Sequence, residues 1–279
     1  MKQVGLIGYP VAHSRSPQMH NAAFRAIGFD AQYTLWETPP GTLGKRVAAL
    51  RAQNMLGANV TIPYKEDVVP LLDECDMLAA RIGAVNTIVN RNGKLIGYNT
   101  DAPGMLRALA ECPGSPFDSR DKETVILGTG GAARAAAVAL LDAGARSVTI
   151  VGRDETRINV LLDHLAPTAN EQINGALFNS AEANVCLRTA ELVVNATSVG
   201  LKSSDDPLLI DVNLLPVGSL VMDMVFNAGL TPLLQAGRAH GCFVMHGLSM
   251  LLYQGTLAFE LWTGRDAPVE VMRKALGLP

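Results

Sequence analysis

The segment GANVTIPYKE, residues 57–66, arranges polar side chains in a pattern suited to binding and proton transfer. Alternate side chains of a strand share a face, so Asn59 and Thr61 are expected on one face of the strand. Val60 and Ile62 are expected to point into the apolar packing on the other face. Pro63 has no N–H and ends the strand, which places Lys65 just beyond it. The pattern predicts a polar surface with one cation. Taken alone, it is better explained as an edge strand with a solvated lysine.

A second group of residues with chemical potential is the glycine-rich turn around Gly128. Glycines at 128 and 130 and an alanine at 133 follow a strand-like run and open a helix-like run, the context of a βαβ dinucleotide motif. Such glycines let the backbone approach a pyrophosphate at the positive helix N-terminus. The alternative is a flavodoxin-like domain that needs only a tight turn. The expected cofactor contacts here are Gly128, Gly130, Gly131 and Ala132.

The choice between NAD and NADP is expected at the end of the next strand, which reads Gly152-Arg153-Asp154. Arg153 can stack on adenine or bind the 2′-phosphate of NADP. Asp154 can bind the free 2′-hydroxyl of NAD and repel that phosphate. Both side chains also fit a solvated loop, and Asp154 also fits an N-cap of the following helix.

The first hundred residues alternate strand-like and helix-like runs, which is α/β patterning. The last two strands flank Arg91-Asn92-Gly93, and Asn-Gly predicts a hairpin at the antiparallel edge of a mixed sheet. Strands are expected at 3–8, 32–37, 57–62, 84–90 and 94–99, and helices at 17–27, 41–54 and 66–81.

A change of composition at residues 112–122, rich in Pro, Gly, Ser and charge, marks a surface connection to a second domain. That domain opens with the βαβ unit, in which Gly144 ends the helix. Its parallel sheet is expected to continue to about residue 245. The further strand candidates are 176–178, 192–197, 220–225 and 242–245, followed by an apolar helix over 248–264 and a second possible helix over 268–277.

Composition favours a protein that acts on small molecules. A chain of 279 residues is long enough for two domains with their own cores. The formal net charge of −3 and 18% charged residues give no basic stripe for nucleic acid or an anionic membrane. No apolar run approaches the ~20 residues of a membrane helix, so a cytoplasmic location is expected.

The cysteines and histidines show no metal-ligand spacing and no C-x-x-C pair. Free thiols packed as small apolar groups in a reducing compartment are therefore expected, with neither a metal site nor a disulfide framework. The four cysteines are Cys75, Cys112, Cys186 and Cys242.

Seven segments in order make the chain similar to the shikimate dehydrogenase family, which includes quinate/shikimate dehydrogenases. They are GYPVAHSRSPQMHNAAF, GANVTIPYKE, GAVNTIV, GYNTDAPG, LGTGGAARA, VNATSVG and MLLYQGTLAFELWTG. The resemblance implies two α/β domains and an active site in the cleft: a catalytic, substrate-binding domain with a mixed sheet, formed by residues 1–102 and 246–279, and a doubly wound Rossmann domain at 103–245. It also implies an NAD(P)-dependent oxidoreductase of aromatic amino acid biosynthesis.

The resemblance further implies roles for individual residues. Lys65 and Asp101 would form the catalytic pair, and Thr197, in the VNATSVG segment, would contact the cofactor. The residues implied to hold the hydroxyls and carboxylate of a cyclohexene or cyclohexane acid are Ser14, Ser16, Asn59, Thr61, Asn86 and Gln254.

Several of these residues also have structural explanations. Ser16 before Pro17 is typical of a helix N-cap, and Asp101 with Pro103 soon after fits another cap. On their own, both residues favour capping. Gln254 shares a helical face with apolar residues, so it is expected to be buried and to need a polar partner.

The opening segment then has a chemical interpretation. Oxidation of a secondary alcohol needs a base within hydrogen-bond reach of the hydroxyl proton as hydride leaves. Lys65 can be that base when neutral, which requires a site that favours the neutral amine or an alkaline reaction medium. Asp101 is expected to position Lys65 and share its proton. In the reductive direction Lys65 would be the acid.

The sequence departs from the family pattern at two places. Where the family normally reads Val-Tyr-Asn-Pro, this chain has Phe226 and Ala228 in place of the Tyr and Pro. Loss of the tyrosine hydroxyl predicts weaker shikimate binding, by roughly 10- to 150-fold if nothing compensates, or a different preferred acid. An acid at 154 replaces the usual Ser/Thr and favours NAD slightly over NADP, with dual use open.

Three hypotheses follow. The first is reversible NAD(P)-dependent oxidation of shikimate, quinate or a close ring hydroxy acid to the 3-dehydro ketone. The second is a non-catalytic protein on the same fold that senses NAD(P) or a metabolite. The third is a dehydrogenase of a related polyhydroxylated or amino-substituted ring acid. A monomer and a homodimer are both compatible with the sequence.

Overall fold

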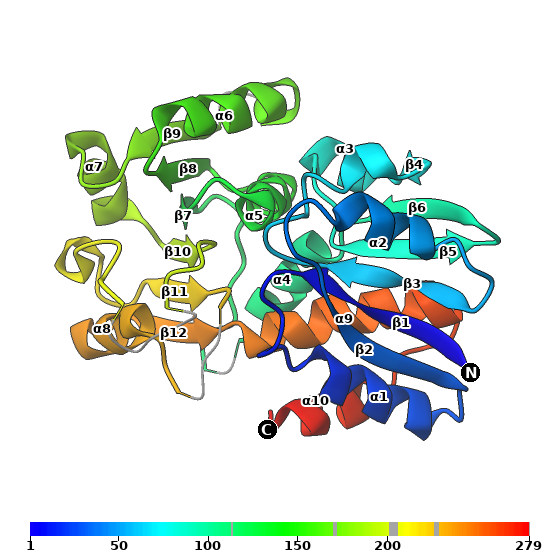
Figure 1. Cartoon of the computed structure of the whole chain (residues 1–279). Helices are drawn as coiled ribbons and strands as arrows, with labels where there is room; N and C mark the ends of the chain where they lie inside the picture. The colour runs from blue at the N-terminus through cyan, green and yellow to red at the C-terminus, as the bar shows by residue number, and fades with distance from the viewer. Residues whose placement is uncertain (113, 170–171, 201–205, 226–228, 279) are drawn as a thin grey trace. The chain divides into compact units, whose positions relative to one another are not determined.

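The chain forms two compact α/β units, each with a six-stranded sheet (Figure 1). The structure, a computed structural model, describes residues 1–112, 114–169, 172–200, 206–225 and 229–278. The first unit is Met1–Gly104 with Leu251–Pro279, and the second is Met105–Met250. The chain passes between the units inside two helices, α4 (Asp101–Ala110) and α9 (Leu248–Thr263).

The first unit has a mixed sheet of order β2-β1-β3-β5-β6-β4. Strands β1, β2 and β3 are parallel, whereas β5 pairs antiparallel with β3 and β6, which confirms the mixed sheet. Besides parts of α4 and α9, its elements are β1 (Lys2–Gly8), α1 (Ser16–Ala26), β2 (Ala31–Glu37), α2 (Leu43–Ala49), β3 (Met55–Val60), η1 (Val69–Leu71), β4 (Glu74–Cys75), α3 (Met77–Ile82), β5 (Thr87–Arg91), β6 (Lys94–Tyr98) and α10 (Val269–Leu276).

The predicted Asn-Gly hairpin joins β5 and β6. Asn92 and Gly93 have φ of 56° and 93°, the positive values that a type I′ turn needs. The hairpin is not the outermost part of the sheet, because the two-residue strand β4 pairs with β6 beyond it.

The helix predicted over 66–81 is wrong. Its place is taken by η1, β4 and α3, since Pro70 interrupts the helical hydrogen bonding. Asp76 then starts α3 as an N-cap that accepts from the N–H of Ala79 at 2.8 Å. The helix predicted over 41–54 is also shorter and ends at Ala49.

The second unit has a fully parallel sheet of order β12-β11-β10-β7-β8-β9. The chain starts in the middle strand β7, moves outward to β9, returns to β10 and continues to the other edge, which is the doubly wound Rossmann topology. Its elements are β7 (Glu123–Leu127), α5 (Gly131–Asp142), β8 (Ser147–Gly152), α6 (Glu155–Ala169), β9 (Ile173–Leu177), α7 (Ala181–Thr189), β10 (Leu192–Asn195), η2 (Val212–Leu214), β11 (Leu220–Asp223), α8 (Pro232–His240) and β12 (Phe243–His246).

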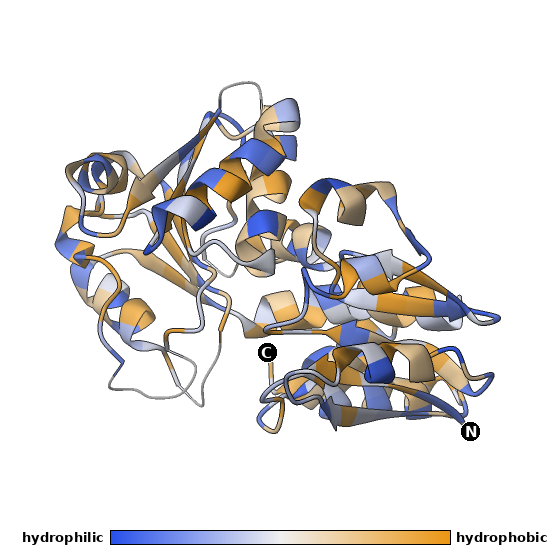
Figure 2. Cartoon of the chain, turned by 45° about the horizontal axis from the view of Figure 1, so that its top comes forward, coloured by the Kyte–Doolittle hydropathy of each residue, from blue (hydrophilic) through white to orange (hydrophobic). Residues whose placement is uncertain are grey.

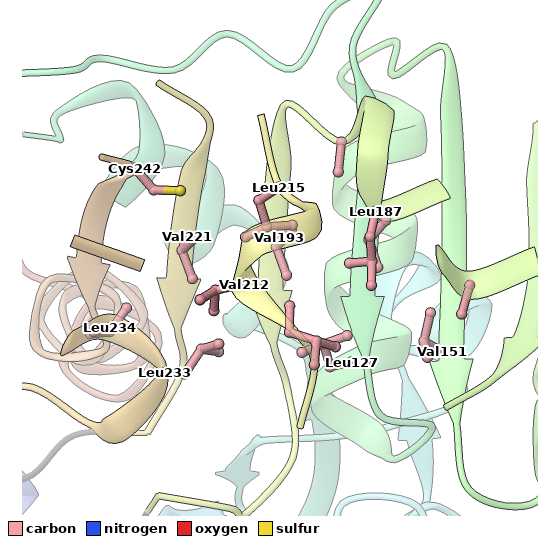
Figure 3. Close-up of a cluster of buried hydrophobic side chains, with 14 of the residues drawn as sticks. Leu127, Val151, Leu187, Val193, Val212, Leu215, Val221, Leu233, Leu234 and Cys242 are labelled. Atoms are coloured by element: carbon pink, nitrogen blue, oxygen red, sulfur yellow. The ribbon is translucent and has the colours of Figure 1, made fainter. Parts of the chain in front are cut away.

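The core of this sheet explains its apolar strands. Val193 and Val221 from neighbouring strands are fully buried and pack with Leu234 of α8 (Figure 3). Parallel strands covered on both faces have nearly continuous apolar sequences, and such residues colour much of this sheet orange in Figure 2. The packed strands hold their carboxyl ends in register, and this edge is where nucleotides bind in doubly wound sheets.

Helix α9 is the most apolar long helix and has 16 residues. Among the described residues, no helix is long and apolar enough to cross a membrane.

Candidate functional site

Lys65 and Asp101 form an ion pair that is largely buried. The Nζ of Lys65 donates to Oδ2 of Asp101 at 2.6 Å, and the side chains are 15% and 6% exposed. The turn after β3 carries Lys65, and the N–H of Val85 donates to its carbonyl at 2.7 Å. Asp101 is the first residue of α4. Because both backbones are fixed, the amine and the carboxylate are held together before any ligand arrives.

The second oxygen of Asp101 is held by an amide. Nδ2 of Asn86 donates to Oδ1 of Asp101 at 2.8 Å. The carboxylate is therefore not free to cap α4; that role belongs to Asn99, whose Oδ1 accepts from the N–H groups of Asp101 and Ala102 at 3.1 and 3.3 Å. The capping interpretation of Asp101 is wrong, because a neighbouring residue supplies the cap.

Asn59 lies near the end of β3 and is 5% exposed. Its Oδ1 accepts from the hydroxyl of Tyr33 at 2.9 Å. Its Nδ2 donates to the carbonyl of Asn86 and to the hydroxyl of Thr87, each at 3.1 Å. Three hydrogen bonds thus hold this amide, from β2, from the start of β5 and from the residue before β5.

These contacts form one continuous set of hydrogen bonds in the first unit, which we call the polar network. Thr87, Thr100 and Tyr33 belong to it, although they were not singled out from the sequence. Thr87 directly follows Asn86 and Thr100 directly precedes Asp101, so both lie next to residues that were named from the sequence. Tyr33 lies 26 positions from its partner Asn59, and no sequence pattern connects the two. The network consists of Ser14, Ser16, Tyr33, Asn59, Lys65, Asn86, Thr87, Thr100 and Asp101.

The serines lie at the start of α1. Ser16 is the first helical residue and gives no side-chain cap, so the capping interpretation is wrong here too. The hydroxyl of Ser14 instead accepts from the N–H of Ser16 and donates to its hydroxyl, both at 3.2 Å. Ser16 in turn hydrogen-bonds Tyr33, whose pKa is raised mainly by complete burial. The serine pair therefore joins the network through Tyr33.

Thr61 follows β3, which ends at Val60. Its N–H donates to the carbonyl of Ile7 at 2.8 Å, and no hydrogen bond engages its hydroxyl within the described residues. Ile62 is 46% exposed, so its expected apolar packing is wrong. The strand ends at Val60, two residues before the expected end, so alternation does not extend to Ile62.

Gln254 of α9 is buried at 9% exposure, as predicted. Its Nε2 donates to the carbonyl of Leu251 at 2.8 Å, and its Oε1 accepts from Nδ2 of Asn86 at 3.5 Å. Gly104 permits this close packing, because a Cβ there would lie 2.6 Å from the backbone nitrogen of Gln254. Helix α9 thus places an amide next to the polar network.

An aromatic cluster of His20, Phe24, Tyr33, Phe259 and Trp262 lies behind the network. The imidazole of His20 stacks on the Tyr33 ring at 4.6 Å and 10° and meets Trp262 edge-on at 5.3 Å. His20 is fully buried, and burial lowers its pKa to about 3. Its ring is therefore neutral at physiological pH.

The predicted nucleotide turn lies in the second unit, between β7 and α5. Gly128 has φ of +117°, which favours glycine. Gly130 has an ordinary φ of −86°, and a Cβ built on it meets nothing within 4 Å. Neither conformation nor internal packing requires glycine at 130, so the open space above the N-terminus of α5 fits a pyrophosphate.

Arg153 and Asp154 follow β8. Oδ1 of Asp154 accepts from the N–H groups of Thr156 and Arg157 at 2.9 and 3.3 Å, which makes it the N-cap of α6. Arg153 is exposed, and Arg157 is exposed one helical turn later. This second cation was not predicted, although its i, i+4 spacing from Arg153 was visible in the sequence.

Thr197 lies after β10, in a loop organised by Asn195. Oδ1 of Asn195 accepts from the N–H and hydroxyl of Thr197 at 3.0 and 2.7 Å. Nδ2 of Asn195 donates to Oδ1 of Asp223 at 3.0 Å. Burial raises the pKa of Asp223 to about 6, against hydrogen bonds from Thr231 and Asn195 that lower it. These bonds fix the loop at the carboxyl edge of the sheet. The substituted positions Phe226 and Ala228 lie outside the described residues.

Family models match three parts of the chain. The model described as "Shikimate dehydrogenase substrate binding domain" matches residues 6–88. The model "Shikimate / quinate 5-dehydrogenase" matches residues 111–203, and "Shikimate 5'-dehydrogenase C-terminal domain" matches residues 247–276.

Individual relatives match over nearly the whole length. A protein of Symbiobacterium thermophilum named "Shikimate dehydrogenase (NADP(+))" is 46% identical over 98% of this chain and 92% of its own. Shikimate 5-dehydrogenase from Thermus thermophilus, in complex with NADP(H) and shikimate, is 35% identical with a TM-score of 0.86 and 99% coverage of both chains. The Listeria monocytogenes enzyme, in complex with shikimate and NAD, is 33% identical with a TM-score of 0.87, covering 98% of this chain and 96% of its own.

The cofactors of these relatives bear on the expected preference. NADP occurs in the Symbiobacterium name and the Thermus complex, whereas NAD occurs in the Listeria complex. The cofactor class is thus a nicotinamide dinucleotide. The slight preference for NAD expected from Asp154 is not supported.

Proposed function

This chain belongs to the shikimate dehydrogenase family, and we propose that it interconverts shikimate and its 3-dehydro ketone with NADP as the preferred cofactor. The observation that carries the proposal is the buried ion pair of Lys65 and Asp101 within a network of hydroxyls and amides. Such a network suits a polyhydroxylated acid, since each substrate hydroxyl needs a donor or an acceptor.

In this proposal the substrate binds to residues 1–102 and 246–279. Ser14 and Ser16 contact its carboxylate at the N-terminus of α1, where the helix dipole favours an anion. The hydroxyl of Thr61, which has no partner among the described residues, is available to a ring hydroxyl. The amides of Asn86 and Gln254 bind the hydroxyl next to the reacting carbon. Asn59 is already hydrogen-bonded on both amide atoms, so we assign it two roles. It holds its neighbours in the polar network in place, and it forms part of the surface that binds the substrate.

The proton of the reacting hydroxyl moves to the Nζ of Lys65 during oxidation. Bound NADP supplies the hydride acceptor at its nicotinamide ring. Lys65 accepts the proton as the neutral amine. In the reverse reaction the ammonium group of Lys65 donates its proton to the ketone oxygen. Asp101 holds the amine in place and stabilises its charged form.

Residues 103–245 bind the dinucleotide in this proposal. Gly128, Gly130, Gly131 and Ala132 form the pyrophosphate cradle, and Thr197 contacts the nicotinamide half from the loop after β10. In this proposal Asp154 serves mainly as the N-cap of α6, through its Oδ1, and not as the ribose ligand. Arg153 is then free to bind the 2′-phosphate, which supports NADP.

The proposal is tested by initial rates of NADPH or NADH formation at alkaline pH. We expect turnover of shikimate with NADP, a lower kcat/KM with NAD, and weaker activity on quinate. Activity on quinate with none on shikimate would show that quinate, and not shikimate, is the substrate. An inert protein with intact far-UV circular dichroism would contradict it.

Replacement of Arg153 by glutamine should shift cofactor preference. We expect KM for NADP to rise roughly 10- to 150-fold, the value of one charged hydrogen bond, with little change for NAD. Arg146→Gln is the matched control, since Arg146 is an exposed arginine that pairs with Glu123 at 3.6 Å near the opposite ends of β7 and β8. Equal changes for both cofactors would contradict the 2′-phosphate assignment.

A further inference from the structure

Thr87 is completely buried at the first position of β5. It pairs directly with Asn59 on β3, so the two side chains lie side by side on one face of the sheet. Its hydroxyl contacts Nδ2 of Asn59 and Oδ1 of Asn86 at 3.1 Å each, and Oγ1 of Thr100 at 3.2 Å. One hydroxyl thus connects two amides that face different parts of the site.

The orientation of the Asn86 amide is decided by these contacts. Its Oδ1 faces two donors, the N–H of Thr100 at 2.8 Å and the hydroxyl of Thr87. Its Nδ2 consequently faces Oδ1 of Asp101. If the Asn86 amide were flipped, its NH2 group would face the N–H of Thr100, and its oxygen would face the carboxylate of Asp101. Both contacts are repulsive. Thr87 therefore helps to keep the NH2 group of Asn86 directed at the carboxylate of Asp101.

The Asn59 amide is fixed in the same way. Thr87 accepts from its Nδ2, which leaves Oδ1 directed at the hydroxyl of Tyr33. Tyr33 leads on to Ser16 at the start of α1. A hydroxyl has one proton and two lone pairs, so Thr87 can accept from Asn59 and donate to Asn86 at once.

We infer that Thr87 is a positioning residue for the proposed reaction, because its hydroxyl sets the orientation of the Asn86 amide on Asp101 and of the Asn59 amide on Tyr33. This inference rests on the proposed function. Thr87 acts through the two asparagines on both the carboxylate that holds Lys65 and the surface that binds the substrate. Loss of its hydroxyl affects both kcat and KM for the acid, and spares KM for the dinucleotide.

The test compares Thr87→Val, which keeps the shape and loses the hydroxyl, with Thr87→Ser, which keeps the hydroxyl. We expect kcat/KM for shikimate to fall about 10- to 100-fold in the valine variant, the size of one or two buried hydrogen bonds. The serine variant should stay within about threefold of wild type. Thr256→Val is the control, because Thr256 is also buried and its hydroxyl bonds, within the part of the chain that the structure describes, only the carbonyl of Tyr253 in its own helix.

If the valine variant does not fold, Thr87→Ser and Thr87→Ala form the test, since both lack the methyl group and differ only in the hydroxyl. Equal kcat/KM in the variants of either pair would overturn the inference. The side-chain amide NMR signals of Asn59 and Asn86 give a readout without turnover. They should move in Thr87→Val and not in Thr256→Val, and unmoved signals would overturn the inference. If wild type does not oxidise shikimate, the proposed function fails, and the amide signals still decide the role of Thr87.

Discussion

Replacement of Lys65 by methionine is expected to lower kcat for shikimate oxidation by about 10²- to 10⁴-fold, the usual contribution of a general base. Methionine retains much of the length of the side chain and removes the amine. The reacting hydroxyl then has no amine within reach to take its proton. Asp101 keeps the hydrogen bond from Asn86 in this variant, and a carboxylate is in general a much weaker base than an amine.

Substrate binding should change far less than kcat in this variant. The binding surface proposed for the acid consists of the serines, Thr61 and the amides, which do not depend on the amine. The dissociation constant of shikimate, measured by calorimetry in the presence of NADP, is expected to stay within about tenfold of wild type. A variant that turns over shikimate at the wild-type rate would remove Lys65 from the mechanism.

Lys94 provides a matched control. It is an exposed lysine on β6 of the same unit and also forms an ion pair, with Glu74. Lys94→Met removes an ammonium group from the same sheet but leaves the polar network intact. Its kcat should equal that of wild type, because exposed ion pairs contribute little.

Most of the strands could be predicted because they depend on local sequence, whereas the proposed catalytic pair depends on the resemblance to the family. The hairpin at Asn92-Gly93 and the strand-turn-helix around Gly128 each need particular residues at particular places. Lys65 and Asp101 could be identified from segments that resemble the family. That the two side chains meet across 36 residues was implied by the resemblance alone, because no local pattern connects them.

Two errors concern the caps. Ser16 before Pro17 and Asp101 before Pro103 both had the pattern of a helix start, and both helices do begin there. The side chains nevertheless bond elsewhere, because the neighbours Ser14 and Asn99 already accept from the backbone N–H groups. A sequence pattern can locate a helix end without showing which oxygen satisfies it.

Tyr33 and Thr87 could not be predicted for a different reason. Each looks like an ordinary strand residue, with aromatic or β-branched character. Their roles come from the register that sets β3 beside β5 and from the fold that brings β2 to Asn59. Cross-strand partners are decided by tertiary structure, which a single sequence does not display.

The first unit is expected to lose stability steeply in acid because of His20. The unfolded chain binds a proton on this imidazole near pH 6.5, whereas the folded unit binds it only near pH 3. The folded state therefore holds fewer protons throughout this range, and its stability falls as the pH is lowered from 6.5 towards 3. The contribution of His20 to the free energy of unfolding is about 5 kcal/mol in full, and about 3 kcal/mol of this contribution is lost by pH 4.

The physical cause is the absence of any partner for the charged ring. Neither Nδ1 nor Nε2 of His20 has a hydrogen-bond partner among the described residues. The ring is enclosed by Tyr33, Phe259 and Trp262, which cannot solvate an imidazolium. Acid therefore favours opening of the unit that carries the polar network, because the charged ring is solvated only in the opened or unfolded state.

His20→Phe should remove this part of the acid sensitivity while keeping an aromatic ring against Tyr33. Urea unfolding at pH 7 and pH 4 measures the loss in each protein, and the loss in the variant should be smaller by about 3 kcal/mol. Both tryptophans of the chain, Trp36 and Trp262, lie in the first unit, so their fluorescence reports its unfolding. His13→Gln, at an exposed histidine of the same unit, should lose as much as wild type. An equal loss in His20→Phe and wild type would show that the charged imidazole finds a hydrogen-bond acceptor or water in the folded state.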